Sequence, residues 1–385
     1  MGGVHEIDCA KEPVMKPTQS KAGDWVRVKS KEEILKTLDK NGRLEGLPFM
    51  PQMFKYCGQK VQVFKRAHKT CDTIAGLQTG YIGRKVPDGV HLEFRCDGKA
   101  HGGCQAACLI FWKEAWLEQL DDETVAATQA AAPLHVTPLP TRHSCTEEDV
   151  VRATRAAAGD REPRYVCQAT ELHSFSTPLK WWDARQYIED YRSGNTSLIV
   201  MLRTFVYVTF YFGSLAHRYR LGRPARWLYG ALMKIVGGSP MRRTRGKLPA
   251  DRPTPRSDLN LAPGDLVRVK SFEQILDTIN VNNSNRGLSF DAEMVMFCGK
   301  THRVRTRVEK FIDESSGRMK TLKTPAVILE GGYCRGCYSE QRFFCPRGIF
   351  AWWREVWLEK VPEGAVQRGD QPEPSLVHDK QRLRA

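Results

Sequence analysis

The chain has 385 residues, of which 41% are hydrophobic, 27% charged and 9% aromatic. This composition is typical of a soluble globular protein and excludes a chain that is disordered throughout. The length allows two or three domains, and the formal net charge of +15 indicates an acidic partner only where the charge is concentrated on one surface.

The first 22 residues have no periodic pattern and are predicted to form a flexible tail. They contain no basic segment followed by an apolar run, so no secretory signal is visible and we expect a cytoplasmic protein. In that compartment the twelve cysteines are expected to be reduced thiols or metal ligands. Export by another signal would leave disulfides as the alternative.

Residues 23–120 and 264–361 are two copies of one sequence unit. GDWVRVKSKEEILKTL begins at Gly23 and GDLVRVKSFEQILDTI begins at Gly264. About twenty of the first forty-four paired positions, 241 residues apart, are identical. Because about a hundred residues are enough for one compact core, each copy is predicted to be a small domain.

Each copy opens with the pattern of a strand followed by a helix. Trp25 and Val26 begin an alternating strand, and Ser30 with Glu33 forms a capping box for the helix. Short strands follow, and in the second copy the segment from Phe311 to Glu330 has the pattern of a hairpin. These features predict an α+β fold in which two small SH3-like β-barrels flank a helical middle region.

The rest of the chain is predicted to connect and extend the two repeats. The segment from Pro178 to Gly194 has the pattern of one helix, with proline in its first turn and glycine at its end. The predicted order is a tail at 1–22, the first repeat at 23–120, a linker at 121–143, the helical middle region at 144–236, a linker at 237–263, the second repeat at 264–361 and a disordered tail at 362–385.

Basic charge is concentrated between Arg203 and Arg256. This stretch contains twelve Lys or Arg residues and a single acid, Asp251, so it supplies +11 of the net +15. Two apolar segments accompany it, Leu198 to Leu215 and Trp227 to Val236. We interpret them as core-packing helices joined by a solvated basic loop. The alternatives are an interfacial hairpin on an anionic membrane surface and a phosphate-binding surface for nucleic acid.

Each repeat has four cysteines, the number of thiolates that a closed tetrahedral zinc site needs. The offset of 241 residues relates Cys57 to Cys298, Cys96 to Cys337 and Cys104 to Cys345. We therefore predict two structural zinc ions, with small buried thiols in a reduced core as the alternative. The predicted ligands are Cys57, Cys96, Cys104 and Cys108 in the first repeat and Cys298, Cys334, Cys337 and Cys345 in the second.

One segment departs from the constant offset. Val90 to Glu93 resembles Val327 to Glu330 at an offset of 237 residues, which would pair Cys108 with Cys345. The number of four cysteines in each repeat is the same in either alignment.

His101 stands beside the cysteines of the first repeat, and Arg342 stands at the matching place in the second. His101 is expected to be a surface histidine. The alternatives are that it replaces a cysteine as metal ligand or forms a reactive thiol and base pair with Cys104. Cys9, Cys71, Cys145 and Cys167 show no partner pattern.

Both repeats close with the motif W-[KR]-E-x-W-L-E, from Trp112 to Glu118 and from Trp353 to Glu359. We predict that these tryptophans lie in the core and that their indole N–H groups find partners. An exposed platform on which a base or sugar stacks is the alternative.

Several segments together resemble a family of bacterial proteins that has no assigned activity. They include GDLVRVKSFEQIL, FCG, CPRGIFAWWREVWLE and YVCQATEL, and the resemblance covers most of residues 23–360. It implies the duplicated architecture and a bacterial origin, and it implies no catalytic residue. The chain departs from the family at Gln341, where the family's second repeat has a cysteine.

No glycine-rich phosphate loop, GxSxG, HExxH or paired-carboxylate signature occurs in the sequence. The leading hypothesis is therefore a non-catalytic, zinc-stabilised binding or scaffold protein whose SH3-like modules bind a protein partner. One alternative is an enzyme or accessory protein of a bacterial biosynthetic pathway that uses a metal or a Cys/His site. The other is a nucleic-acid-binding protein.

Overall fold

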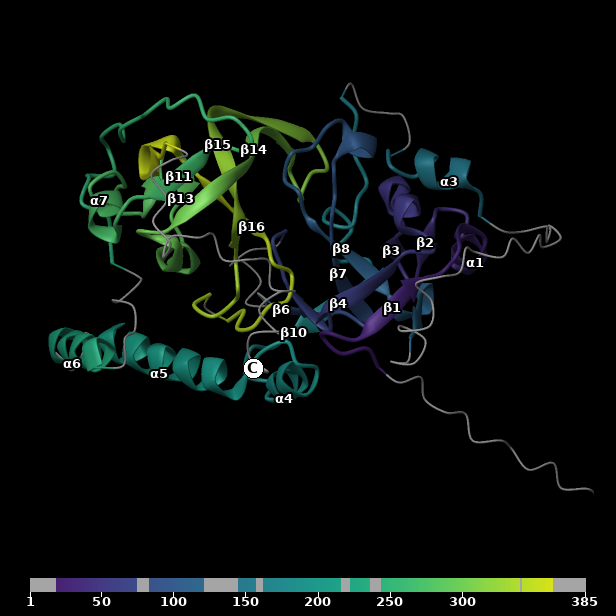
Figure 1. Cartoon of the computed structure of the whole chain (residues 1–385), viewed down its shortest axis with the longest axis horizontal. Coiled ribbons are helices and arrows are strands. Elements are labelled where there is room, and N and C mark those ends of the chain that lie inside the picture. The colour runs from purple at the N-terminus through teal and green to yellow at the C-terminus, as the bar shows by residue number, and fades with distance from the viewer. Residues whose placement is uncertain are drawn as a thin grey trace, which may run out of the picture.

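The computed structural model describes residues 19–74, 83–120, 145–156, 162–215, 222–235, 244–339 and 341–362. The predicted linker at 121–143 lies outside these residues, as do positions 1–18 and 363–385 of the two predicted tails. Figure 1 shows two β-structured parts side by side, with helices along one edge of the molecule.

The first repeat forms a five-stranded antiparallel sheet in the order β8-β7-β4-β1-β9. Its helix α1 begins as predicted, because the Ser30 hydroxyl accepts a hydrogen bond from the Glu33 N–H and completes a capping box. The elements are β1 (Trp25–Val28), α1 (Lys31–Thr37), β2 (Arg43–Leu44), β3 (Leu47–Pro48), η1 (Pro51–Tyr56), β4 (Lys60–Arg66), β5 (Lys69–Cys71), β6 (Gly83–Lys85), β7 (Gly89–Arg95), η3 (Lys99–His101), β8 (Leu109–Lys113), η4 (Glu114–Trp116) and β9 (Leu117–Gln119).

The second repeat forms the same sheet, in the order β16-β15-β14-β11-β17. Ser271 and Gln274 cap its helix in the same way. The elements are β11 (Leu266–Val269), α7 (Phe272–Leu276), β12 (Ser284–Asn285), β13 (Leu288–Ser289), η7 (Ala292–Phe297), β14 (Thr301–Ile312), β15 (Met319–Tyr333), β16 (Phe350–Trp353), η8 (Glu355–Trp357) and β17 (Leu358–Lys360).

The register of the two sheets confirms the shorter offset in one strand. Val90 lies opposite Trp112, and Val327 lies opposite Trp353. The tryptophans are 241 residues apart and the valines 237, so β7 and β15 correspond with a gap of four residues. The predicted α+β class, with a repeated antiparallel sheet on each side of a helical middle region, is confirmed.

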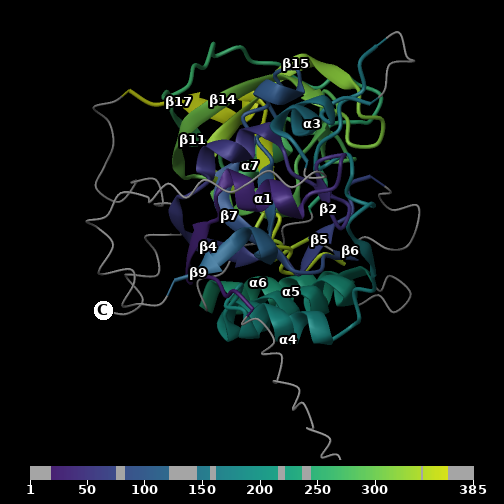
Figure 2. The same ribbon diagram turned by 90° about the vertical axis from the view of Figure 1, so that its right-hand side faces the viewer.

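The middle region contains α3 (Glu147–Arg152), β10 (Thr177–Leu179), α4 (Arg185–Arg192), α5 (Leu198–Leu215) and α6 (Gly222–Ile235). The prediction of one helix from Pro178 to Gly194 is wrong at its start. Pro178 lies in β10, opposite Arg84 of β6, where the Arg84 guanidinium donates to the Ser176 carbonyl at 2.7 Å. Gly194, with a φ of +71°, follows the end of α4 as expected. Figures 1 and 2 show α4, α5 and α6 together at one end of the molecule.

The four tryptophans of the closing motifs form the centres of the two cores. Trp112, Trp116, Trp353 and Trp357 have no exposed surface, and the ring centroids of each pair lie 6.5 Å apart in an edge-to-face arrangement. The indoles of Trp116 and Trp357 each donate to a threonine hydroxyl at 3.0 Å. The prediction that these tryptophans lie in the core is confirmed, and a stacking platform on these rings is excluded because no base could reach them. The prediction that each indole N–H finds a partner is wrong for Trp112 and Trp353, whose buried Nε1 atoms have no hydrogen-bond partner among the described residues.

One buried lysine joins the three parts of the chain. The Lys69 ammonium, at the start of β5, donates to Asp190 Oδ2 at 2.6 Å and to Gln186 Oε1 at 3.1 Å, both in α4. It also donates to the Phe343 carbonyl of the second repeat at 2.8 Å. Burial lowers the pKa of Lys69, and Asp190 opposes this effect.

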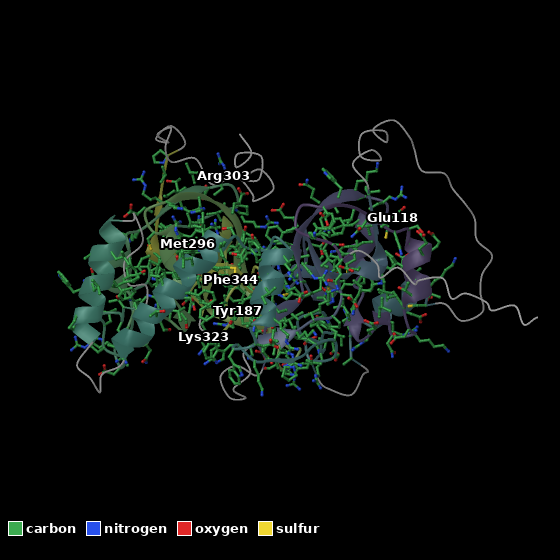
Figure 3. All side chains as sticks on the ribbon, turned by 90° about the horizontal axis from the view of Figure 1, so that it is seen from below. Glu118, Tyr187, Met296, Arg303, Lys323 and Phe344 are labelled. Carbon is green, nitrogen blue, oxygen red and sulfur yellow. The ribbon has the colours of Figure 1, made fainter. Side chains whose placement is uncertain are left out.

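Aromatic rings surround this ammonium. Its distance is 4.9 Å to the centre of the Tyr187 ring and 5.9 Å to that of Phe344. Figure 3 shows Tyr187 and Phe344 close together near the middle of the molecule. The rings exclude water from the ion pair, so the charge cannot be compensated by solvent if a partner is removed.

We therefore expect Lys69→Met to lower the free energy of unfolding by about 3–5 kcal/mol, because it leaves the Asp190 carboxylate buried without its ammonium partner. Urea unfolding followed by circular dichroism measures the change. The matched control is Lys55→Met, because the exposed pair of Lys55 and Asp97 at 3.1 Å should contribute less than about 1 kcal/mol. Equal effects of the two substitutions would contradict the structural role of Lys69.

Candidate site: two thiol groups and the cavity between the repeats

Each repeat contains one loop in which the backbone of a cysteine packs closely against a glycine, so that this cysteine lies near a second one. In the first repeat Gly98 has a φ of +69°, and a Cβ there would lie 1.9 Å from the Cys104 carbonyl oxygen. In the second, Gly336 has a φ of +70° and a Cβ there would lie 2.6 Å from the Cys345 N–H nitrogen. A side chain would push each loop open, so both glycines are required for the placement of the cysteine that follows.

Hydrogen bonding shows which cysteines correspond. The Cys96 N–H donates to the Cys108 carbonyl at 2.8 Å, and the Cys334 N–H donates to the Ile349 carbonyl at 2.8 Å. Cys108 and Ile349 are 241 residues apart, so Cys96 corresponds to Cys334 in the structure and not to Cys337. The constant offset gave the wrong partner because the four-residue gap precedes this loop.

A first thiol group gathers around a small cavity of about 40 Å³. Cys96, Cys104, Cys108 and Cys167 line it together with His101. The cavity is large enough to admit a single ion. Cys167, which the sequence pattern left without a partner, takes the place that the prediction gave to Cys57.

His101 is buried, which corrects the expectation of a surface histidine. Its exposed fraction is 1%. The Nε2 atom lies 3.1 Å from the Val166 carbonyl oxygen, a contact that requires Nε2 to carry the proton. Nδ1 then has a lone pair, and this atom is buried without a hydrogen-bond partner. A histidine that donates one ring N–H to a carbonyl while the other nitrogen is free has the arrangement of a metal ligand.

The thiols of this group receive N–H donors, as metal-bound thiolates do. The Gln52 amide lies 3.1 Å from Cys96 Sγ, and the Ile312 N–H lies 3.4 Å from Cys104 Sγ. Burial raises the pKa of Cys96 to about 12 and also raises the pKa of Cys167. Without a cation these thiols therefore stay protonated at neutral pH, whereas a bound metal would deprotonate them.

A second thiol group is its counterpart in the second repeat. Cys345 and Cys334 occupy the places of Cys104 and Cys96, and one thiol again comes from outside the repeat, from Cys71 of β5. A hydrogen bond from Cys345 lowers the pKa of Cys71 to about 6, against the effect of burial and with help from Arg347 and Arg342. The same bond raises the pKa of Cys345. The two thiols therefore titrate as a coupled pair, in which the first proton to leave is shared between them.

A cavity of about 510 Å³ lies between the repeats beside this second group. The walls come from both copies, because β5 and the loop around Cys108 belong to the first repeat and η7, the β14–β15 turn and β16 belong to the second. Most of the surface is apolar, from residues such as Phe297, Ile312 and Trp352. Such a volume is in the range of small-molecule binding sites.

Two arginines of the second cysteine loop face this cavity. The buried Arg347 guanidinium binds both carboxylate oxygens of Glu314 at 3.0 Å and the Thr73 hydroxyl at 2.7 Å. It therefore fastens β5 of the first repeat to the β14–β15 turn of the second. Arg342 stands where the first repeat has His101, and its Nε atom is buried without a hydrogen-bond partner.

Cys57 and Cys298 belong to neither group. They cap η1 and η7, and the glycine after each adopts a φ of +77° or +78°. The N–H groups of Gly58 and Gly299 then donate to the Val28 and Val269 carbonyls at 2.8 and 2.9 Å. This pair of cysteines therefore marks a turn of the repeated framework, and nothing in this geometry brings it to the other thiols.

No set of three or more His, Cys, Asp or Glu side chains in the described residues is arranged so that it could hold a metal ion. The predicted zinc therefore remains a prediction. The residues that fit a metal best are Cys96, Cys104 and Cys167 with His101 Nδ1, because they share one cavity and the histidine nitrogen has no other partner. In the second group Arg342 supplies a fixed cation at the equivalent place.

Sequence reasoning missed Cys71 and Cys167 as members of these groups. Cys167 lies in YVCQATEL, one of the segments that carry the family resemblance, and this was the available signal. Cys71 lies in an ordinary strand pattern and gave no signal.

None of the described helices is long and apolar enough to cross a membrane. A comparison with models of known protein families and with curated proteins finds no match to the chain. The resemblance to a bacterial family therefore remains a prediction.

Zinc analysis of protein purified without added metal tests the revised ligand set. If zinc binds there, we expect Cys167→Ser and His101→Ala to lower the zinc content at least tenfold, because each would remove one of the four candidate ligands. Cys57→Ser is the matched control and should leave the content unchanged. Loss of zinc in Cys57→Ser, with retention in Cys167→Ser, would restore the ligand set predicted from sequence.

Proposed function

We propose that the protein is a binding protein that holds a small, mainly apolar molecule with an acidic group in the cavity between its repeats. The observation that carries this proposal is the cavity of about 510 Å³, which has walls from both repeats. Sites at the junction of two domains are common places for small ligands. The proposal keeps the binding role of the leading hypothesis and replaces the protein partner by a small molecule.

The walls support an apolar ligand. Leu288, Met294 and Phe311 line the cavity together with the aromatic residues of β16. Burying apolar ligand surface against such side chains contributes roughly 25 cal/mol per Å². Of the acids in the walls, Glu314 binds Arg347 and Asp313 binds Lys320 at 2.9 Å. Asp291 and Glu293 also line the cavity, and each accepts a backbone N–H, from Glu293 and from Tyr338.

Arg342 is the reason to expect an acidic group on the ligand. Its Nε atom is a buried donor without a partner, and leaving such a donor unsatisfied costs about 1–3 kcal/mol. A ligand carboxylate that accepted this N–H would remove the cost and form a charge-assisted hydrogen bond. The Arg342 guanidinium would then fix the orientation of the ligand.

In this proposal each repeat is a SH3-like β-barrel. The strand order supports the narrower description, because the opening strand pairs with the closing strand in both copies, β1 with β9 and β11 with β17. Zinc in the first thiol group would stiffen the loop that forms one wall of the cavity, since Cys108 lines both spaces.

Titration calorimetry with a panel of apolar carboxylic acids, from indole-3-acetate to decanoate, tests the binding role. We expect one site per chain, an affinity at least tenfold lower in Arg342→Met, and no binding in Ala106→Trp, which fills the cavity. Arg303→Met is the matched control, because that exposed guanidinium donates to the Gly264 carbonyl away from the cavity. No saturable binding of any acid, or equal binding by all variants, would overturn the proposal.

A thiol-dependent enzyme is the second candidate, and the Cys71–Cys345 pair favours it. A buried thiolate with two neighbouring arginines, at the wall of a ligand-sized cavity, is the arrangement of a nucleophilic cysteine. This candidate differs from the sequence-based alternative, which placed the reactive thiol at Cys104.

The pH dependence of alkylation by iodoacetamide, read by mass spectrometry, separates the two candidates. The pKa of Cys71 is lowered to about 6, so the thiolate is already formed above that pH and the rate should rise through pH 6 and then level off. Burial raises the pKa of Cys57 to about 11, so its rate should still rise above pH 9. Cys345→Ala should lower the rate of alkylation of Cys71 at pH 7. An inert Cys71 would remove the enzyme candidate.

A further inference from the structure

Helices α4, α5 and α6 and the turn before α4 expose a surface of large apolar side chains. Eight of them are between 51% and 74% exposed. They are Trp182, Ile188, Tyr191, Leu198, Ile199, Leu202, Trp227 and Leu228, and together they are called the helix surface below. Figures 1 and 2 both place the three helices at the same end of the molecule. Contiguous exposed patches of this kind mark interaction sites.

The orientation of α5 is fixed by its other face. Thr204 and Tyr207 are buried, and the Tyr207 ring lies 5.0 Å from that of Tyr338 in the second repeat and 6.0 Å from that of Tyr229 in α6. Leu198 and Leu202 are one turn apart on the exposed side. The helix therefore presents one apolar stripe outward while the protein covers the opposite stripe, which suits a planar partner and excludes a lipid-surrounded span.

The sequence segment that carries the helix surface is basic. From Lys180 to Lys234 the sequence has nine Lys or Arg residues and three acids. Each acid has a cation partner within the protein, since Asp183 pairs with Arg185, Glu189 with Arg66 and Asp190 with Lys69. The basic residues in and beside α5 and α6, Arg203, Arg218, Arg220, Arg223 and Arg226, have no acid between them in the sequence.

We infer that the helix surface docks on an anionic lipid bilayer, with α5 and α6 lying in the plane of the interface. Aliphatic side chains such as Leu198 and Leu202 enter the boundary between headgroups and acyl chains, and Trp227 occupies the interfacial region that indole rings prefer. The exposed Arg203 of α5 binds a lipid phosphate, with an attraction that falls with salt. A nucleic acid fits less well, because five of the eight exposed side chains are aliphatic and offer no ring on which bases stack.

This inference is independent of the cavity and its ligand. The helix surface lies outside the lining of the cavity, so failure of one proposal leaves the other standing.

Flotation of the full-length protein with phosphatidylcholine vesicles, with and without phosphatidylserine, tests the inference. We expect the wild type to float with the anionic vesicles at low salt and to be released at high salt. Leu202→Glu with Trp227→Glu should lower the partition coefficient at least tenfold, because a charge replaces each apolar contact. Arg203→Glu should lower it through charge alone.

Matched controls replace residues of the same kind elsewhere. Val151→Glu changes an exposed apolar residue of α3 that is 52% exposed, and Arg303→Glu changes an exposed arginine of β14; both should float like the wild type. The inference is wrong if the wild type floats with neither kind of vesicle. It is also wrong if the double variant floats to the same extent as Val151→Glu. It is also wrong if the double variant instead loses self-association in sedimentation, or loses salt-sensitive DNA binding without any vesicle binding in the wild type.

Discussion

The three parts of the chain depend on the buried ammonium of Lys69. A charge taken out of water is stable only where its partners are already in place, and those of Lys69 come from α4 and from the second cysteine loop. The first repeat, the middle region and the second repeat must therefore assemble together. The same contact fixes β5, so it also fixes Cys71 and one wall of the cavity.

Local sequence patterns predicted the parts of the fold that depend on interactions between residues close together in the chain. The capping boxes at Ser30 and Ser271, the alternating strands and the core tryptophans needed only the spacing of polar and apolar residues. The duplication was equally visible. The prediction of a helix from Pro178 failed because strand pairing with β6 is a tertiary contact, which no local pattern contains.

The site could be predicted only in part, for a related reason. Cys96 and Cys104 share a loop, so their spacing indicated a group. Cys167 and Cys71 reach the two groups through folding contacts between segments far apart in the chain, and neither carries a periodic signal. Cys57 was predicted as a ligand from a constant offset, and it is not among the residues that line the small cavity. Its glycine neighbour shows that the offset preserves a turn.

In each thiol group, one cysteine comes from outside the repeat that holds the cysteine loop. This limits whether each half of the chain can form its group alone. A duplicated gene ordinarily yields two halves that remain exchangeable or separable. Here Cys71 of the first repeat lies with the thiols of the second repeat, and Cys167 of the connecting region lies with those of the first. Either half produced alone would therefore lack one thiol of its group.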